Sequence, residues 1–189
     1  MDERIIVFID ASNFWFGTKE LMKRRHISLG LINYYRLARL LAHNRKIIRI
    51  FFYTALVNSK DNPTKYATQD RFLIKIREMP FCTIRAARAM RRGETYVEKG
   101  VDVMLAVDLL KLARLNSYDT AILLSGDGDF VEAVKDVQEM GKRVELAYYT
   151  FNQSMMLRAI CDEFIEITET MLALSSMRTM PGELVGMGK

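Results

Sequence analysis

The sequence has few residues of the kinds that bind zinc or form disulfides. Its 189 residues include two cysteines and two histidines. Cys82 and Cys161 lie far apart without metal-ligand spacing, so we expect them to be reduced core residues. His26 and His43 stand in basic, helical surroundings and form no zinc pattern. A disulfide scaffold and a zinc domain are therefore both excluded from the expected classes.

Long hydrophobic runs are also missing. No apolar stretch approaches the roughly 20 residues that a membrane-spanning helix needs, and residues 1–4 do not resemble a signal peptide. There is no internal repeat and no interdomain linker. We expect no membrane partner, a cytoplasmic location, and one domain over residues 1–172. Residues 173–189 lack periodicity and are expected to form a flexible tail.

The sequence is basic overall and contains one cluster of aspartates. The formal net charge is +5 and the isoelectric point is near 9.2, which favours an anionic partner. Basic residues gather between positions 85 and 99, around Gly93, in a segment that we expect to be a hairpin or a mobile loop. Two interpretations of this segment stay open: a solvated positive face, or an arm that contacts phosphates and carries a stacking aromatic. The residues of that arm are Arg88, Arg91, Arg92, Tyr96 and Lys99.

The cluster of aspartates follows two predicted strands. The apolar strand 120–124 leads into Ser125-Gly126-Asp127-Gly128-Asp129-Phe130, where the glycines are expected to permit a sharp turn and Asp129 to cap the next helix. The apolar run 4–9 ends at Asp10. In open α/β sheets ligands bind beyond the carboxyl ends of the strands, so Asp10 and Asp127 would share a crevice if their strands are neighbours. A divalent metal is the usual means of offsetting their repulsion.

Two further aspartates belong to the predicted helix that ends at Arg114. Asp102 lies in its first turn, where it is either a helix-start acid favoured by the macrodipole or a fourth member of the site. Asp108 lies on the apolar stripe of the same helix, and a buried carboxylate there needs a partner. We expect Asp108 to be a structural hydrogen-bonding group. Strands and helices alternate along the whole chain. The other strands are expected at 46–54, 81–87, 143–149 and 164–167, and the other helices at 14–25, 65–78, 131–140 and 154–161, with a final turn or helix at 169–175. A further helix is expected after its cap at Asn33, with Leu37, Leu40 and Leu41 on its apolar face.

With this constellation assembled, the chain resembles the LabA-like branch of the NYN-domain proteins, within the PIN-like nuclease superfamily. The resemblance covers about residues 4–168. It rests on the order and spacing of the following motifs: Phe8-Ile9-Asp10 with Asn13, Lys99-Gly100-Val101-Asp102 with Asp108, Ser125 to Phe130, Gly141-Lys142, and Ser154 with Asp162-Glu163-Phe164.

The resemblance implies a three-layer α/β/α fold with a central parallel sheet of strand order 3-2-1-4-5. It also implies a ribonuclease-type site that uses Mg²⁺ or Mn²⁺ and acts on RNA. We expect the RNA to be single-stranded, in keeping with the basic arm and its aromatic residue. Asp10, Asp102, Asp127 and Asp129 are the expected catalytic and metal-binding residues. Asn13 and Ser125 are expected to orient water or phosphate. The oligomeric state is left open and includes a homodimer.

Two other classes of site fit these residues poorly. An aspartyl phosphatase would want a second Asp two residues after Asp10, where Ser12 stands, and a dinucleotide site would want a third glycine near Gly126 and Gly128. A NYN-like module that binds RNA or a regulatory partner without cutting remains the alternative, because a complete acidic set does not measure turnover. Metal-dependent cleavage of single-stranded RNA distinguishes the two.

Overall fold

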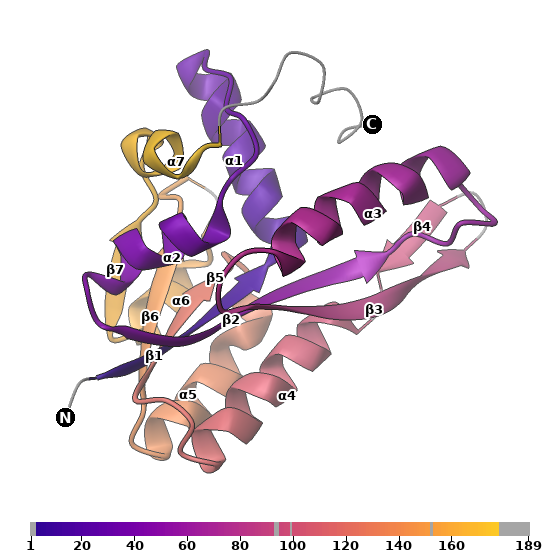
Figure 1. The fold of residues 1–189 in the computed structure, drawn as a ribbon. Coiled ribbons are helices and arrows are strands. Elements are labelled where there is room, and N and C mark those ends of the chain that lie inside the picture. Colours follow the sequence, from indigo (N-terminus) through magenta and orange to yellow (C-terminus); the bar gives the residue numbers. More distant parts are fainter. Residues whose placement is uncertain (1–2, 93–94, 99, 152, 178–189) are drawn as a thin grey trace.

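The computed structural model describes residues 3–92, 95–98, 100–151 and 153–177, and side chains are not described between residues 88 and 99. Seven strands form one sheet in the order β4-β3-β2-β1-β5-β6-β7 (Figure 1). The strands are β1 Arg4–Asp10, β2 Lys46–Leu56, β3 Cys82–Arg92, β4 Thr95–Glu98, β5 Thr120–Leu124, β6 Arg143–Tyr148 and β7 Glu163–Glu166. Six of them are parallel, and β4 pairs antiparallel with β3 at one edge.

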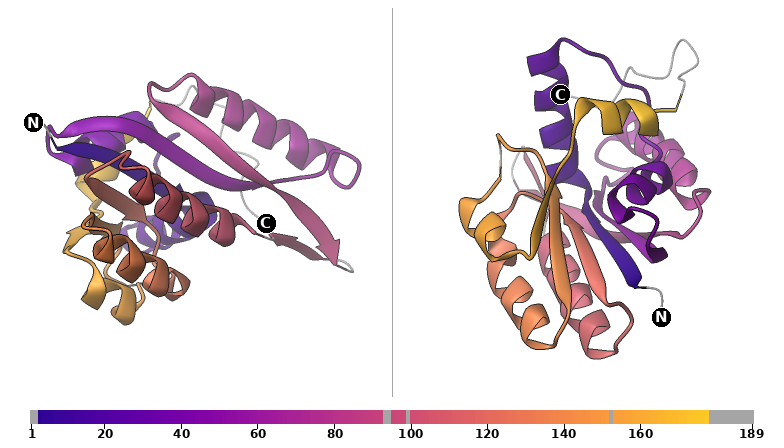
Figure 2. Two further views of the ribbon diagram at one scale, coloured as in Figure 1. Left: turned by 90° about the horizontal axis from the view of Figure 1, so that it is seen from below. Right: turned by 90° about the vertical axis from the view of Figure 1, so that its left-hand side faces the viewer.

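Helices cover both faces of this sheet, which makes three layers. The helices are α1 Ala11–Arg25, α2 Tyr34–Ala42, α3 Pro63–Arg77, α4 Val101–Arg114, the 3-10 helix η1 Gly128–Phe130, α5 Val131–Glu139, α6 Met155–Ile160 and α7 Glu169–Ser175. Helices α1, α2, α3 and α7 lie on one face, and α4 and α5 lie on the other (Figures 1 and 2). The predicted fold class is confirmed, and the parallel strands extend the predicted order by one strand at the β7 edge.

Polar residues fix where the helices begin. Asn33, Asn62 and Ser154 each accept a hydrogen bond from a backbone N–H three residues further on, which satisfies a donor that the first helical turn leaves free. Pro63 stands at the first position of α3, where its missing N–H costs no hydrogen bond. The first helix differs from the prediction: it begins at Ala11 rather than Phe14, because the Asp10 side chain caps it by accepting from the Asn13 N–H.

The core is centred on β1, which lies between β2 and β5. Residues 5–9 of this strand are all buried, as a parallel strand covered on both faces requires. Phe14 continues that core from α1, whereas Phe16, two residues later, is 73% exposed. Since β1 and β5 are parallel neighbours, their carboxyl ends meet at one edge of the sheet. That edge is where Asp10 and the loop after Leu124 come together.

The basic segment was expected to form either a hairpin or a mobile loop, and it folds as a hairpin. Backbone pairing joins Arg91 of β3 to Tyr96 of β4, and the hairpin projects beyond the neighbouring strands (Figure 1). The side chains of Arg88, Arg91, Arg92 and Tyr96, and the whole of Lys99, lie outside the described residues, so their proposed RNA contacts remain predictions.

The end of the packed structure lies beyond the predicted boundary at residue 172. Helix α7 continues to the buried Ser175, and the Met177 N–H donates to the Leu31 carbonyl over 2.7 Å. Residues 178–189 of the predicted tail lie outside the described residues. Within the part of the chain that is described, no helix has the length and apolar character that crossing a membrane would require.

Candidate nuclease site

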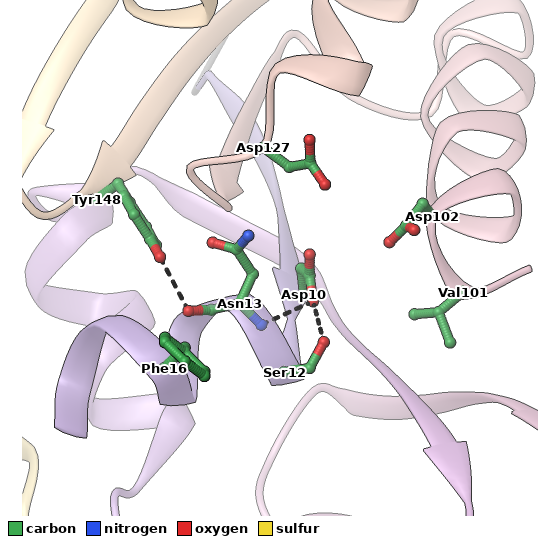
Figure 3. A pocket seen from close by; sticks show the side chains of 8 residues that line it. All are labelled: Asp10, Ser12, Asn13, Phe16, Val101, Asp102, Asp127 and Tyr148. Carbon is green, nitrogen blue, oxygen red and sulfur yellow. Dashed lines mark hydrogen bonds between the residues drawn. The ribbon is translucent and has the colours of Figure 1, made fainter. Parts of the chain in front are cut away.

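A cavity of about 510 Å³ opens at the carboxyl edge of β1 and β5. Side chains from α1, α4, β1, β6 and the loop after β5 surround it (Figure 3). They are Asp10, Ser12, Asn13, Phe16, Val101, Asp102, Asp127 and Tyr148. Three of the four predicted catalytic aspartates therefore face one space, although they come from three different parts of the chain.

Asp10 is the buried member of this set, with 2% of its surface exposed. Its Oδ1 accepts from the Ser12 hydroxyl and from the Asn13 N–H, each over 3.1 Å. Burial raises the pKa of this carboxyl and the nearby charge of Asp102 raises it further, while the hydrogen bonds act in the opposite direction. A carboxylate held in this way has a fixed orientation and a strong need for a positive charge.

Asp102 faces Asp10 from the first turn of α4. Its pKa is raised, first by partial desolvation at the cavity wall and then by the charges of Asp127 and Asp129. Helix α4 begins at Gly100, whose φ of +86° lies in the left-handed region that glycine tolerates best. This turn brings the start of α4 to the crevice, so Asp102 is more than a helix-start acid.

The loop after β5 places the other two aspartates. The Asp127 carboxylate faces the cavity and also caps η1, because its Oδ1 accepts from the Asp129 N–H over 3.0 Å. The expectation that Asp129 caps the next helix is therefore wrong. Asp129 itself is exposed and does not line the cavity, although its charge acts on Asp102.

The glycines of that loop act differently from the expectation of an unusual backbone turn. Positive φ values among the described glycines occur at Gly100 and Gly141, and not at Gly126 or Gly128. Gly128 is needed for close approach, because a Cβ there would lie 2.9 Å from the Ser154 Oγ. The Ser154 N–H also donates to the Gly126 carbonyl over 2.8 Å, so the start of α6 supports the loop that carries Asp127.

Asn13 and Ser125 have separate positions in the site. The Asn13 Oδ1 accepts from the Gly126 N–H over 2.8 Å, which leaves its amide nitrogen on the cavity side (Figure 3). Ser125 is completely buried, and its hydroxyl donates to Asp10 and accepts from the Asp127 N–H, each over 3.2 Å. These contacts are internal, so the geometry favours a role in positioning Asp10, and the expected role of Ser125 in orienting water or phosphate stays a prediction.

Two aromatic residues of the cavity were not predicted. The Tyr148 hydroxyl donates to the Asn13 carbonyl over 2.9 Å, and Phe16 lies at the rim. Gly17 allows α1 to pack closely on Tyr149, the residue after β6, because a Cβ at position 17 would lie 2.2 Å from the Tyr149 ring. The sequence signal for Phe16 was its place in the run Phe14-Trp15-Phe16, because three consecutive residues of a helix cannot all face inward. Tyr148, at the end of an apolar strand, carried no such signal.

Asp108 is structural, as expected, within the residues described. Its Oδ2 accepts from the Tyr53 hydroxyl over 3.0 Å and pairs with Arg85 over 3.2 Å. Burial, followed by the Asp108 charge, raises the pKa of Tyr53 and keeps it a donor. This partly buried carboxylate is satisfied by protein groups and does not line the cavity.

The side chains that line the cavity are chemically suited to a hard divalent cation. The cavity offers carboxylate oxygens, which Mg²⁺ and Mn²⁺ prefer as ligands, and two of its carboxyls have raised pKa values that a cation would lower. Across the described ranges, however, no group of three or more His, Cys, Asp or Glu side chains is arranged to hold an ion as it stands. The chemistry of the carboxylates nevertheless suits such an ion.

Comparison with known proteins agrees with this architecture. A protein of unknown function from Vibrio parahaemolyticus, VPA0982, has the same fold, with a TM-score of 0.70, 21% identity, and coverage of 89% of this chain and 94% of that one. The uncharacterized protein y4oD of Sinorhizobium fredii is 43% identical over 49 residues, which are 26% of this chain and 23% of y4oD. The match thus spans less than a quarter of that relative's length.

The family itself is shown by a match over nearly the whole packed structure. The model of the NYN domain matches residues 4–169, which include β1, α4, β5 and the four aspartates that the sequence analysis singled out. NYN domains are PIN-like nucleases, so the match supports a nuclease-type function and nucleic-acid binding in general. This chain belongs to the NYN domain family.

Proposed function

We propose that this protein is a metal-dependent ribonuclease that hydrolyses phosphodiester bonds in RNA. The observation that carries the proposal is the convergence of Asp10, Asp102 and Asp127 on one cavity at the carboxyl edge of the sheet. The raised pKa values of Asp10 and Asp102 support it: burial raises each of them first and neighbouring carboxylate charges raise them further, and a bound cation would offset both effects.

In this proposal Asp10, Asp102 and Asp127 would hold Mg²⁺ or Mn²⁺, with Asp129 nearby to complete the acidic set. The ion would supply an activated water and stabilisation of the negative charge on the phosphoryl group. The Asp10 carboxylate itself is held in one orientation, because three hydrogen bonds reach its two oxygens. The free amide nitrogen of Asn13 donates towards the cavity, where it would orient a phosphate oxygen or the attacking water.

The proposal also covers substrate and setting. The basic residues of the segment 88–99 are proposed to guide a single RNA strand towards the cavity; they are Arg88, Arg91, Arg92 and Lys99, together with the aromatic Tyr96. We further propose membership of the LabA-like branch, a single domain from residue 1 to the end of α7 and a cytoplasmic location. Assembly into a homodimer is proposed as well, and sedimentation tests it.

The test is cleavage of a labelled single-stranded RNA by purified protein with Mg²⁺, with Mn²⁺, and with EDTA. We expect products with either metal and none with EDTA, and Asp10→Asn should lower the rate by orders of magnitude. Asp136→Asn is the matched control, because Asp136 is an exposed aspartate of α5 that does not line the cavity. Equal cleavage by Asp10→Asn and wild type would contradict the proposal.

A second candidate is a NYN module that binds RNA without cutting it. One observation favours it: the described residues contain no ready three-ligand group. Under this alternative the wild type binds RNA with a strong salt dependence, yet it releases no product with either metal.

A further inference from the structure

Phe16 is an exposed aromatic ring at a functional rim. Its exposed fraction is 73%, the largest among the exposed hydrophobic residues of the described chain. No aromatic or cationic side chain of the described residues packs on its ring, whereas Trp15 beside it has the Lys19 ammonium 5.8 Å from its ring centre. Covering an apolar surface of this kind with a partner is energetically favourable.

The position of Phe16 says what would cover it. Phe16 follows Asn13 by three residues on α1, which makes the two side chains neighbours on the helix surface. Both line the cavity that contains Asp10 and Asp127, and Phe16 lies on the side of Asp10 opposite Asp102 (Figure 3). A ligand whose phosphate approaches the aspartates would therefore bring its neighbouring group against this ring.

We propose that Phe16 is a stacking surface for one nucleobase of a single-stranded RNA whose backbone enters the acidic cavity. The inference rests on the proposed ribonuclease function and adds a residue that holds one base of the single-stranded substrate. Every base has a flat π-face, so one phenyl ring accepts any of them. A base inside a duplex already has its faces covered, so only an unpaired base can stack on Phe16. Tyr148 cannot serve instead, because it is 2% exposed and its hydroxyl is held by Asn13.

The experiment is a cycle that changes both the protein and the RNA. Binding of a labelled oligoadenylate is measured by anisotropy in an Asp127→Asn background, with Phe16 intact or changed to alanine or tryptophan. The same measurement uses oligomers that carry one abasic position, moved along the strand. Met155→Ala is the control, because Met155 is 72% exposed and does not line the cavity.

Phe16→Ala is expected to weaken binding about 5- to 150-fold, the range for the loss of one stacked base. Phe16→Trp should keep the affinity, and Met155→Ala should leave it unchanged. The salt dependence should stay the same, because no phosphate contact is lost. One abasic position should weaken binding to the Phe16 protein and cause little further loss in Phe16→Ala.

The results that would overturn the inference are distinguishable from one another. If wild type cleaves RNA but Phe16→Ala binds as tightly as its parent, or every abasic position affects both proteins alike, the stacking role fails and the ribonuclease function stands. If wild type neither binds nor cleaves single-stranded RNA, the proposed function fails and the stacking role fails with it. A duplex cleaved as fast as its single strand would also contradict the inference.

Discussion

The hydroxyl of Ser125 donates a 3.2 Å hydrogen bond to Oδ2 of Asp10, and this bond joins two strand ends that are 115 residues apart in the sequence. It connects the carboxyl ends of β5 and β1 where they lie side by side. The bond lowers the pKa of Asp10 against the larger effect of burial. It therefore helps to keep a buried carboxylate charged at the centre of the candidate site.

Removing this bond should change the pH dependence of cleavage. In Ser125→Ala the Asp10 carboxylate loses a donor, so its pKa rises and the acid limb of the rate profile moves to higher pH. Ser125→Thr keeps a hydroxyl and serves as the control. Rates measured between pH 5 and 8 test this expectation. A lower rate without a shift of the profile would indicate a purely structural role for Ser125.

Asp102→Asn should stabilise the metal-free protein at neutral pH. The folded-state pKa of Asp102 is raised, so its charged form opposes folding once the pH exceeds the unfolded value of about 3.9. The gain should reach roughly 0.5 kcal/mol, because Asp102 is exposed and solvent screens it, and it should vanish as the pH falls below that value. Urea unfolding in EDTA at pH 7 and pH 3.5 measures it, with Asp136→Asn as the control.

Millimolar Mn²⁺ should raise the thermal midpoint of the wild type. An ion that binds only the folded state stabilises it by about 2.7 kcal/mol at 100 times its dissociation constant. The rise should be lost in Asp10→Asn and kept in Asp136→Asn, with calorimetry as the measurement. An equal rise in all three proteins would mean that Mn²⁺ binds elsewhere.

Asp108→Ala should lower the stability of the protein without lowering its cleavage activity, as expected of a structural aspartate outside the site. It leaves the buried Tyr53 hydroxyl and Arg85 without their shared partner, which should cost about 1–3 kcal/mol of unfolding free energy. Cleavage by the folded fraction should stay within a few-fold of wild type, because Asp108 does not line the cavity. Loss of cleavage from a folded Asp108→Ala protein would contradict this assignment.

Much of the fold could be predicted because it depends on local pattern. The apolar runs of β1 and β5 and the caps at Asn33 and Ser154 give the element order, and alternation of strands and helices gives the class. The antiparallel pairing of β4 and the early start of α1 could not be predicted as firmly. The sequence of the basic segment was compatible with a hairpin and with a mobile loop. The start of α1 was missed because Asp10, which caps it, had been assigned to the site alone.

The candidate site could be predicted where chemistry and strand ends coincide, as at Asp10 and Asp127. Contacts between distant segments were beyond the sequence. The burial of Ser125, the bond from Tyr148 to Asn13 and the fit of Gly128 against Ser154 all depend on how α6 and β6 pack on the site. The exposure of Phe16 depends in the same way on which face of α1 meets the core.

The most direct test of the central claim is a paired measurement on Asp127→Asn, of thermal midpoint in EDTA and of RNA cleavage in Mg²⁺ and Mn²⁺. The amide keeps the shape of the side chain and removes one charge from a repelling set, so the midpoint should stay the same or rise. Cleavage should fall by orders of magnitude as the cation loses a ligand. A variant that folds normally and cleaves as fast as wild type would contradict the account.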